Sequence, residues 1–346
     1  MPASPSSFRL RWQGVVIAVL TIALVWWFAH SLDWSDVWEA MTQAHMGLIV
    51  LTIAVTVQTY ILRALRWQLL LAPLGRARFG PAFRTTVIGF TATFLLPGRV
   101  GEVLRPYLMA RESGFSAAAA FATIVVERVL DLATVILLFA CFLIVTPIDV
   151  GPEVKFGGLA ATLVCIAALG VMVASAGHPE RLARWSGRLT RLLPARAQAA
   201  VGGLVQTFVE GLAVMRRPAG LIGAGVLSVL LWLSIALGIW ATSRALDLTF
   251  AFSGSFLVVM FLVVGVAMPT PAGVGGFHAM YQLAVTRFFL APPDRAAAAA
   301  IVLHALSFVP ISILGLAFMA RDGLTLGGLR RMKSNAEAEE GRATGT

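Results

Sequence analysis

Residues 85–111 read TTVIGFTATFLLPGRVGEVLRPYLMAR, an apolar run that breaks at Pro97-Gly98 and is followed at once by charged residues. The apolar part, Val87 to Leu96, is too short to span a bilayer, which takes about 20 helical residues. A stretch of this length is typical of a re-entrant segment. A second break, MPTPAGVGGFH at 268–278, interrupts another apolar run within 251–290. The two breaks predict helical hairpins rather than ordinary spans.

The composition and the remaining apolar runs are typical of an integral membrane protein. Of 346 residues, 58% are hydrophobic and 13% are charged, roughly half the charged share of soluble domains. Besides the broken segments, six runs are long enough to span: 14–31, 47–66, 117–146, 157–176, 219–243 and 296–320. The sequence therefore predicts an all-α, polytopic helical bundle of about six full spans plus two broken, re-entrant hairpins.

The first run ends in Trp26-Trp27-Phe28 without a small-residue cleavage site, so we expect an uncleaved helix rather than a signal peptide. The predicted organisation is a tail over 1–13, a transmembrane domain over 14–320 and a tail over 321–346. A basic amphipathic segment, 178–217, is expected to lie on the membrane surface.

The positive charges predict how the chain is oriented. The formal net charge is +10, and the Lys and Arg residues gather in short segments between apolar runs, as cytoplasmic loops do. This favours a bacterial-type inner membrane protein with both termini cytoplasmic, and not a nucleic-acid-binding protein. In this arrangement the two broken segments enter from opposite faces, as in an inverted repeat. A version in which each broken segment makes two complete short spans preserves the charge rule too.

The two breaks are the first candidate binding features. Non-helical backbone at membrane depth is tolerated only where protein or a polar cavity satisfies it. Glycine permits a close approach of a ligand, and free N–H groups at a helix start favour an anion. A kink that merely helps packing is the alternative. The candidate residues are Pro97, Gly98, Gly101, Pro271, Gly273, Gly275 and Gly276.

Charged residues after the first break form a second candidate set: Arg99, Glu102 and Arg105. Their spacing of three places them on roughly one side of a helix. Arginine suits phosphate because its planar fork binds two oxygens and stays charged. Glu102 would position an arginine or bind a substrate amine. The alternative is an interfacial cluster whose side chains reach the cytoplasm.

A third set lies inside an apolar helix: Glu127, Arg128 and Asp131. Ionisable groups in a membrane helix are costly and usually mark a site or a pairing partner. Structural ion pairing with Arg99 or Arg105 is the alternative reading.

Other polar and aromatic residues receive weaker interpretations. His278 follows the second break and either titrates near neutral pH or is a hydrogen-bonded structural residue. Arg63, Arg66 and Trp67 are expected at an inner interface. Cys141 and Cys165 lie in apolar runs and are read as packing residues. We recognise no metal-binding, nucleotide-binding or catalytic motif, and the sequence predicts no cofactor and no metal site.

Four motifs in order carry a resemblance to a known family: RALRW at 63–67, LLPGRVGEVLR at 95–105, ERVLD at 127–131 and PTPAGVGG at 269–276. Together they resemble the lysylphosphatidylglycerol synthase transmembrane family, also called flippase-like, over about 14–320. Members fused to a soluble aminoacyl-transferase domain are similar to flippases that move aminoacylated phosphatidylglycerol. We expect a stand-alone member without that domain.

The resemblance assigns the family's pattern to eleven positions of this chain: Pro97, Arg99, Gly101, Glu102, Arg105, Glu127, Arg128, Asp131, Pro271, Gly273 and Gly275. Where the family commonly has a glutamate after the glycine-rich break, this chain has His278.

The function predicted from these features is binding or translocation of an anionic lipid at an intramembrane polar site, by a protein that is not itself an enzyme. The expected partners are an anionic phospholipid or polyprenyl-phosphate lipid, the membrane, and a lipid-modifying enzyme. Two alternatives stay open. One is a membrane-embedded transferase acting on a lipid or polyprenyl phosphate, and the other is a structural partner of a lipid-modifying enzyme.

Overall fold

The computed structural model describes residues 32–96, 100–148, 150–177, 217–268 and 270–324, together with Leu212 and part of 19–30. Every regular element within these residues is helical, which confirms the predicted all-α fold. The basic segment 178–217 lies almost wholly outside the described residues. So does much of the first predicted span, although its described positions between 19 and 28 are helical.

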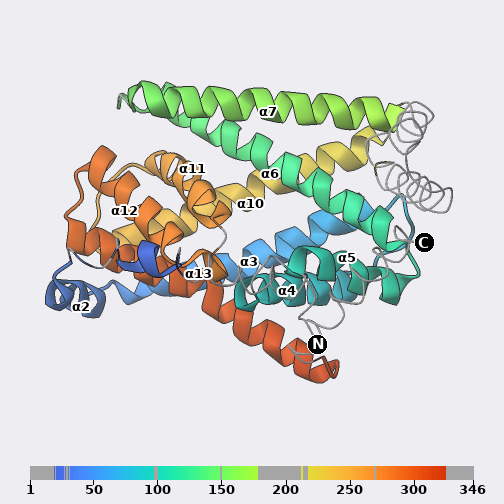
Figure 1. The fold of residues 1–346 in the computed structure, drawn as a ribbon, viewed down its shortest axis with the longest axis horizontal. Helices are drawn as coiled ribbons and strands as arrows, with labels where there is room; N and C mark the ends of the chain where they lie inside the picture. The colour runs from blue at the N-terminus through green and yellow to red at the C-terminus, as the bar shows by residue number, and fades with distance from the viewer. Residues whose placement is uncertain are drawn as a thin grey trace, which may run out of the picture.

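Long helices form the frame of the molecule (Figure 1): α3 (Met46–Leu71), α6 (Ala117–Val145), α7 (Gly151–Gly177), α10 (Pro218–Ala245) and α13 (Pro293–Arg321). In the described part of the chain, five helices are long and apolar enough to cross a membrane. Proline stands at the start of α10 and α13, where its missing N–H costs no helical hydrogen bond. The chain is therefore a multi-pass membrane protein.

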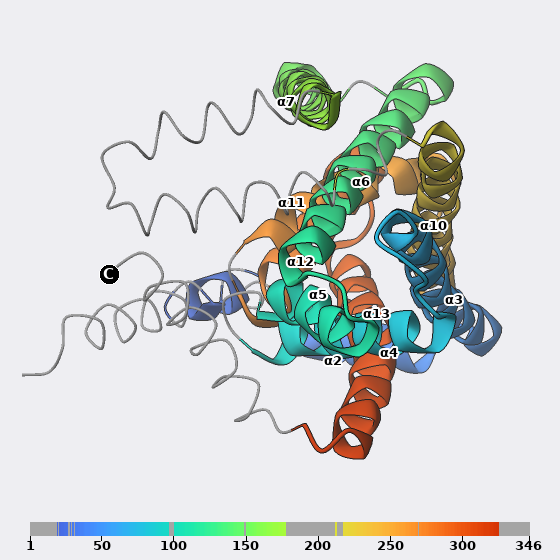
Figure 2. The same ribbon diagram turned by 90° about the vertical axis from the view of Figure 1, so that its right-hand side faces the viewer.

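The long helices are not packed evenly. Helices α3 and α10 lie along each other, whereas α7 lies at the edge of the bundle beside α6 (Figure 2). A short helix, α2 (Trp34–Thr42), is capped by Asp33, whose carboxylate accepts a hydrogen bond from the backbone N–H of Ser35. This helix packs against α13 and exposes Trp34 and Trp38, as expected of an interfacial aromatic belt.

Each broken segment forms a pair of short helices. The first consists of α4 (Phe79–Leu95) and α5 (Val100–Ser113), and the second of α11 (Gly254–Ala267) and α12 (Gly276–Phe289). At 14 to 17 residues, these helices are roughly 21–26 Å long. Within each pair the two helices pack against each other. The predicted hairpins are therefore present, and the first begins at Phe79, earlier than the sequence suggests.

The two hairpins approach from opposite ends of the bundle. Figure 1 shows α11 and α12 at one end of the long helices, and α4 and α5 toward the other. The hairpins meet inside, because α4 contacts the short 3₁₀ turn η3 (Pro271–Gly273) in the second break. This is the opposed arrangement that the sequence predicts, and it sets non-helical backbone in the interior of the protein.

A pair of glycines closes each hairpin next to its break. A Cβ atom on Gly101 would overlap the carbonyl oxygen of Gly89. In the second hairpin, a Cβ atom on Gly265 would lie 2.5 Å from the carbonyl oxygen of Gly276. Small residues let membrane helices approach closely, so both hairpins use the same device at the corresponding place.

Candidate functional site

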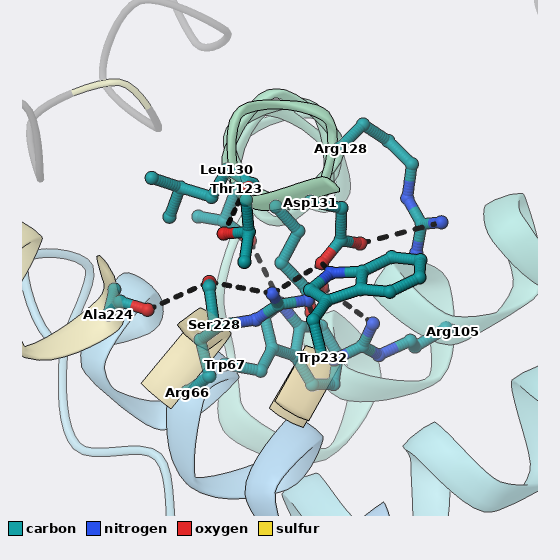
Figure 3. Close-up of polar contacts among 12 residues, drawn as sticks. Arg66, Trp67, Arg105, Thr123, Arg128, Leu130, Asp131, Ala224, Ser228 and Trp232 are labelled. Atoms are coloured by element: carbon teal, nitrogen blue, oxygen red, sulfur yellow. Dashed lines mark hydrogen bonds and ion pairs between the residues drawn. The ribbon is translucent and has the colours of Figure 1, made fainter. Parts of the chain in front are cut away.

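Arg66 is the centre of a buried polar network. It lies on α3 with 0% of its surface exposed. One terminal nitrogen, Nη1, donates to Asp131 Oδ1 at 2.6 Å and to Ser228 Oγ at 2.8 Å (Figure 3). The other, Nη2, donates to Glu127 Oε1 at 2.8 Å. Arg66 thus joins α3 to α6 and α10 in the interior.

Arg105 completes the pairing of Glu127 from the first hairpin. Its Nη1 donates to Glu127 Oε2 at 2.6 Å, so both carboxylate oxygens of Glu127 accept from arginines. The Arg105 guanidinium also lies 3.9 Å from the ring of Trp67, a favourable cation–π distance. Trp67 donates in turn to Thr123 Oγ1 at 2.9 Å.

Asp131 is the second carboxylate, and its two oxygens have different surroundings. Oδ1 accepts from Arg66 and from Trp232 Nε1 at 2.9 Å. Oδ2 is buried with no hydrogen-bond partner, and its nearest cation is Arg128 Nη1 at 3.7 Å. The Arg128 side chain is 44% exposed, so its guanidinium keeps free donors.

The network explains why these charges are tolerated in a membrane protein. Buried ions are stable only when paired and hydrogen-bonded. Arg66, Arg105 and Glu127 are ion-paired, while Arg66 Nε and Arg105 Nε and Nη2 have no hydrogen-bond partner. Arg66 and Trp67, which the sequence places at an inner interface, are both fully buried within the protein. The carboxylates on α6 supply the pairing that allows Arg66 to be buried.

A cavity of about 380 Å³ lies beside this network. Residues of α3, α4, α6, α10, α11, α12 and α13 line it, so it borders both hairpins. Arg63, Arg128 and Asp131 are the charged groups of the wall. Most of the remaining wall is apolar, and it includes Phe94 and Phe277. The cavity therefore combines a cationic region with hydrocarbon-like walls.

The cavity is elongated along α3. Thr52 and Arg63 both line it, and at 1.5 Å per residue their positions are about 16 Å apart along the helix. Thr56, Thr59 and Tyr60 lie between them on the same wall. The charged residues thus stand at one end of a passage that extends for several turns of helix.

Arg63 differs from the other arginines of the site. Its guanidinium lies 4.8 Å from the ring of Phe90 and 5.9 Å from the ring of Tyr60. It makes no ion pair with a described carboxylate, and its Nε has no hydrogen-bond partner. A guanidinium at an apolar cavity without a carboxylate partner is chemically suited to an anionic ligand.

The second break forms a different part of the surroundings. Ala272, Gly273 and Gly275 have positive φ values of 51°, 69° and 83°. His304 Nε2 donates to the Ala272 carbonyl at 3.0 Å, and His278 Nδ1 accepts from the Gly275 N–H at 3.4 Å. The two imidazole centroids are 4.6 Å apart. Both histidines therefore hold the turn, and neither contributes a side chain to the cavity wall.

The structure brings together only part of the predicted site. Glu127, Arg128, Asp131 and Arg105 meet in one network. Glu102 is on the same helix as Arg105 and is partly exposed. The remaining predicted residues divide between those outside the description (Pro97, Gly98 and Arg99) and those at the hairpin turns (Gly101, Pro271, Gly273, Gly275, Gly276 and His278).

Two functional candidates, Arg63 and Arg66, were not assigned to the site from sequence. Their signal was present in RALRW, where arginines three apart stand on one face of an apolar helix. Their place near the end of the apolar run favours an interfacial position. Glu127 and Asp131, four residues apart on α6, are the carboxylates that pair with Arg66.

Comparisons with known proteins agree with this architecture. The profile of the family described as "Lysylphosphatidylglycerol synthase TM region" matches residues 12–315. A curated relative from Haloferax volcanii, named Glycosyltransferase AglD, is 26% identical over 328 residues. The match covers 84% of this chain and 51% of the relative, so the chain spans about half the length of that protein.

Proposed function

Because the chain belongs to the lysylphosphatidylglycerol synthase transmembrane family, we propose that it binds an anionic lipid in its intramembrane cavity and moves that lipid between leaflets. The observation that carries this proposal is the pair Arg63 and Arg128 in the cavity wall. Arg63 Nε has no hydrogen-bond partner, and the Arg128 side chain is 44% exposed. The proposal assigns no catalytic role to the chain. It also places the protein in the inner membrane of a bacterial-type cell, with both termini cytoplasmic.

In this proposal the two ends of the ligand occupy different parts of the cavity. The phosphate binds the guanidinium groups of Arg63 and Arg128, since arginine forms paired hydrogen bonds with phosphate oxygens. The hydrocarbon chain lies against the apolar walls, which include Phe94 and Phe277. Arg66 does not bind the lipid, because its terminal nitrogens already donate to protein oxygens.

Translocation would use the opposed hairpins. The cavity is bounded by α4 of the first hairpin and by α11 and α12 of the second. Displacing one hairpin would open the cavity toward one face of the membrane, and displacing the other would open it toward the opposite face. Alternating access of this kind is common to transporters built from inverted repeats with broken helices.

The test is lipid binding and transfer by Arg63→Gln and Arg128→Gln variants. Each substitution keeps a polar side chain but removes a charge-assisted hydrogen bond of about 1.5–3 kcal/mol. We therefore expect phosphatidylglycerol binding in nanodiscs to weaken by roughly ten- to a hundredfold. Transfer of labelled lipid in proteoliposomes should fall in parallel.

Arg287→Gln is the matched control, because Arg287 is an exposed arginine on α12 that does not line the cavity. It should bind and transfer lipid like the unmodified protein. Equal binding by folded Arg63→Gln and Arg287→Gln proteins would contradict the proposed site.

The Haloferax relative's name favours a second candidate function. A glycosyltransferase relative of which the match covers only 51% suggests that this type of domain holds a lipid-linked acceptor or product beside a catalytic unit. Under this alternative the protein binds a polyprenyl phosphate but transfers no lipid in proteoliposomes. Addition of a sugar donor to the purified chain and analysis of the lipid products would test for transferase activity.

A further inference from the structure

The polar network and the cavity wall carry more positive than negative charge. Four guanidinium groups, those of Arg63, Arg66, Arg105 and Arg128, belong to them. The carboxylates among these residues are Glu127 and Asp131. At neutral pH this described set therefore has an excess of two positive charges.

The excess lies at the cavity and not in the buried part of the network. Glu127 pairs with Arg66 and Arg105 through its two oxygens. Asp131 Oδ1 is occupied by Arg66 and Trp232. Only Asp131 Oδ2 remains, 3.7 Å from Arg128, and Arg63 has no ion pair with a described residue. Arg63 and Arg128 are thus the cations that a ligand would neutralise.

The number of ligand charges then decides how well the cavity is neutralised. An uncompensated charge in a membrane interior is costly. A phosphodiester carries one negative charge and two non-bridging oxygens. A terminal phosphate carries close to two charges at neutral pH and three acceptor oxygens, so it can satisfy two guanidinium forks together.

We infer that the cavity selects lipids with a dianionic terminal phosphate over phosphodiester phospholipids. A phosphate monoester or a diphosphate, on an isoprenoid or a diacylglycerol, belongs to the selected class. This inference rests on the proposed function, since it assigns a headgroup to the same cavity. The apolar walls and the length of the cavity along α3 indicate that the phosphate is attached to a hydrocarbon chain.

The pH dependence of binding follows from the ligand. The second proton of a phosphate monoester leaves with a pKa of about 6. The groups facing the arginine pair are Tyr60 and Arg66 on α3, Arg105 on α5, and Glu127 and Asp131 on α6. None of these residue types ordinarily titrates between about pH 5 and 8. His278 and His304 do not line the cavity, but His304 contacts the rings of Phe277 and Phe308, which do. Binding of a phosphodiester lipid, measured over the same pH range, controls for titration of these histidines.

The experiment compares dioleoyl phosphatidic acid with dioleoyl phosphatidylglycerol, which share acyl chains and differ in headgroup charge. Binding to the full chain is measured in detergent at pH 8 and pH 5. We expect phosphatidic acid to bind at least about tenfold more tightly at pH 8. The preference should shrink toward parity at pH 5, while phosphatidylglycerol binding stays nearly constant.

Variants and a soluble competitor complete the design. Arg63→Gln and Arg128→Gln should each remove most of the preference for phosphatidic acid, and Arg287→Gln should keep it. Thermal unfolding of each variant checks that it is folded. Inorganic phosphate, at the concentrations used for phosphatidic acid, should not displace the lipid.

The outcomes separate the inference from the proposed function. Equal affinity for both lipids at pH 8, with both lost in Arg63→Gln, would overturn the selectivity and leave the lipid site intact. Binding of neither lipid would overturn both. Displacement by inorganic phosphate at equal concentration would assign the site to a soluble phosphate instead of a lipid.

Discussion

At the scale of single residues, Arg66 determines how the interior is held together. Its guanidinium bonds Glu127, Asp131 and Ser228 at once. Every one of these contacts is buried, so water cannot replace the guanidinium if it is lost. Arg63, one helical turn earlier on α3, faces the cavity and has no such partners. In the proposed function these two arginines of one motif have different roles, Arg63 in binding and Arg66 in stability.

Arg66→Leu should destabilise the protein strongly. Removing one partner of a buried ion pair typically costs about 3–5 kcal/mol, because the remaining charges are left uncompensated. Tryptophan fluorescence during thermal unfolding in detergent measures the effect. Arg63→Leu is the matched control and should unfold near the unmodified protein. A similar loss of stability in both variants would refute the division of roles.

At the scale of elements, each hairpin depends on two glycines that face one another beside the break. The backbone of Gly101 approaches that of Gly89, and the backbone of Gly276 approaches that of Gly265. These contacts allow the short helices of each hairpin to fold back tightly on each other. Arg105 on α5 reaches Glu127 because the first hairpin closes in this way.

Alanine in place of one of the facing glycines should open the hairpin to which that glycine belongs. In Gly101→Ala and Gly276→Ala the added methyl group would meet backbone atoms, and such overpacking costs typically 1–3 kcal/mol. The apparent melting temperature in detergent should fall for both variants. Gly80→Ala, where the methyl group meets nothing within 4 Å, should be neutral or slightly stabilising, because alanine favours helix. An equal fall in melting temperature in all three variants would contradict a specific role of the facing glycines.

At the scale of the whole molecule, the long helices set the two hairpins against each other. Figure 1 shows the turn between α10 and α11 at the same end as α2, and the end of α5 at the opposite end. The cavity lies between the hairpins and has wall residues from both, such as Phe90 on α4 and Val266 on α11. In the proposed function, either face of the membrane would reach this cavity when one hairpin moves.

Cysteine labelling tests this sidedness. In a background where Cys141 and Cys165 are alanine, single cysteines at Gln43 and Thr249 should react with a membrane-impermeant maleimide from outside the cell. The matched positions Arg76 and Arg111, at the opposite end of the bundle, should react only after the membrane is opened. These four positions are exposed. Labelling of all four from outside would exclude the opposed arrangement.

The candidate site was predictable only in part, and Arg66 shows why. Charged residues inside an apolar helix are conspicuous in any sequence, so Glu127, Arg128 and Asp131 were predicted. Arg105 was predicted because it follows a broken helix. Nothing local in RALRW distinguishes a buried arginine from one at a helix end. Both occur where an apolar run gives way to charged residues.

The sequence by itself determined the membrane class, the long helices and the two broken hairpins, because these depend on the length and continuity of apolar runs. Only the tertiary structure decided which charges meet. Glu127 and Asp131 lie 61 and 65 residues from Arg66 along the chain, and the packing of α3 on α6 brings them into contact. The energy of a buried charge depends on that geometry. The same geometry pairs Arg66 with two carboxylates and leaves Arg63 at the cavity wall.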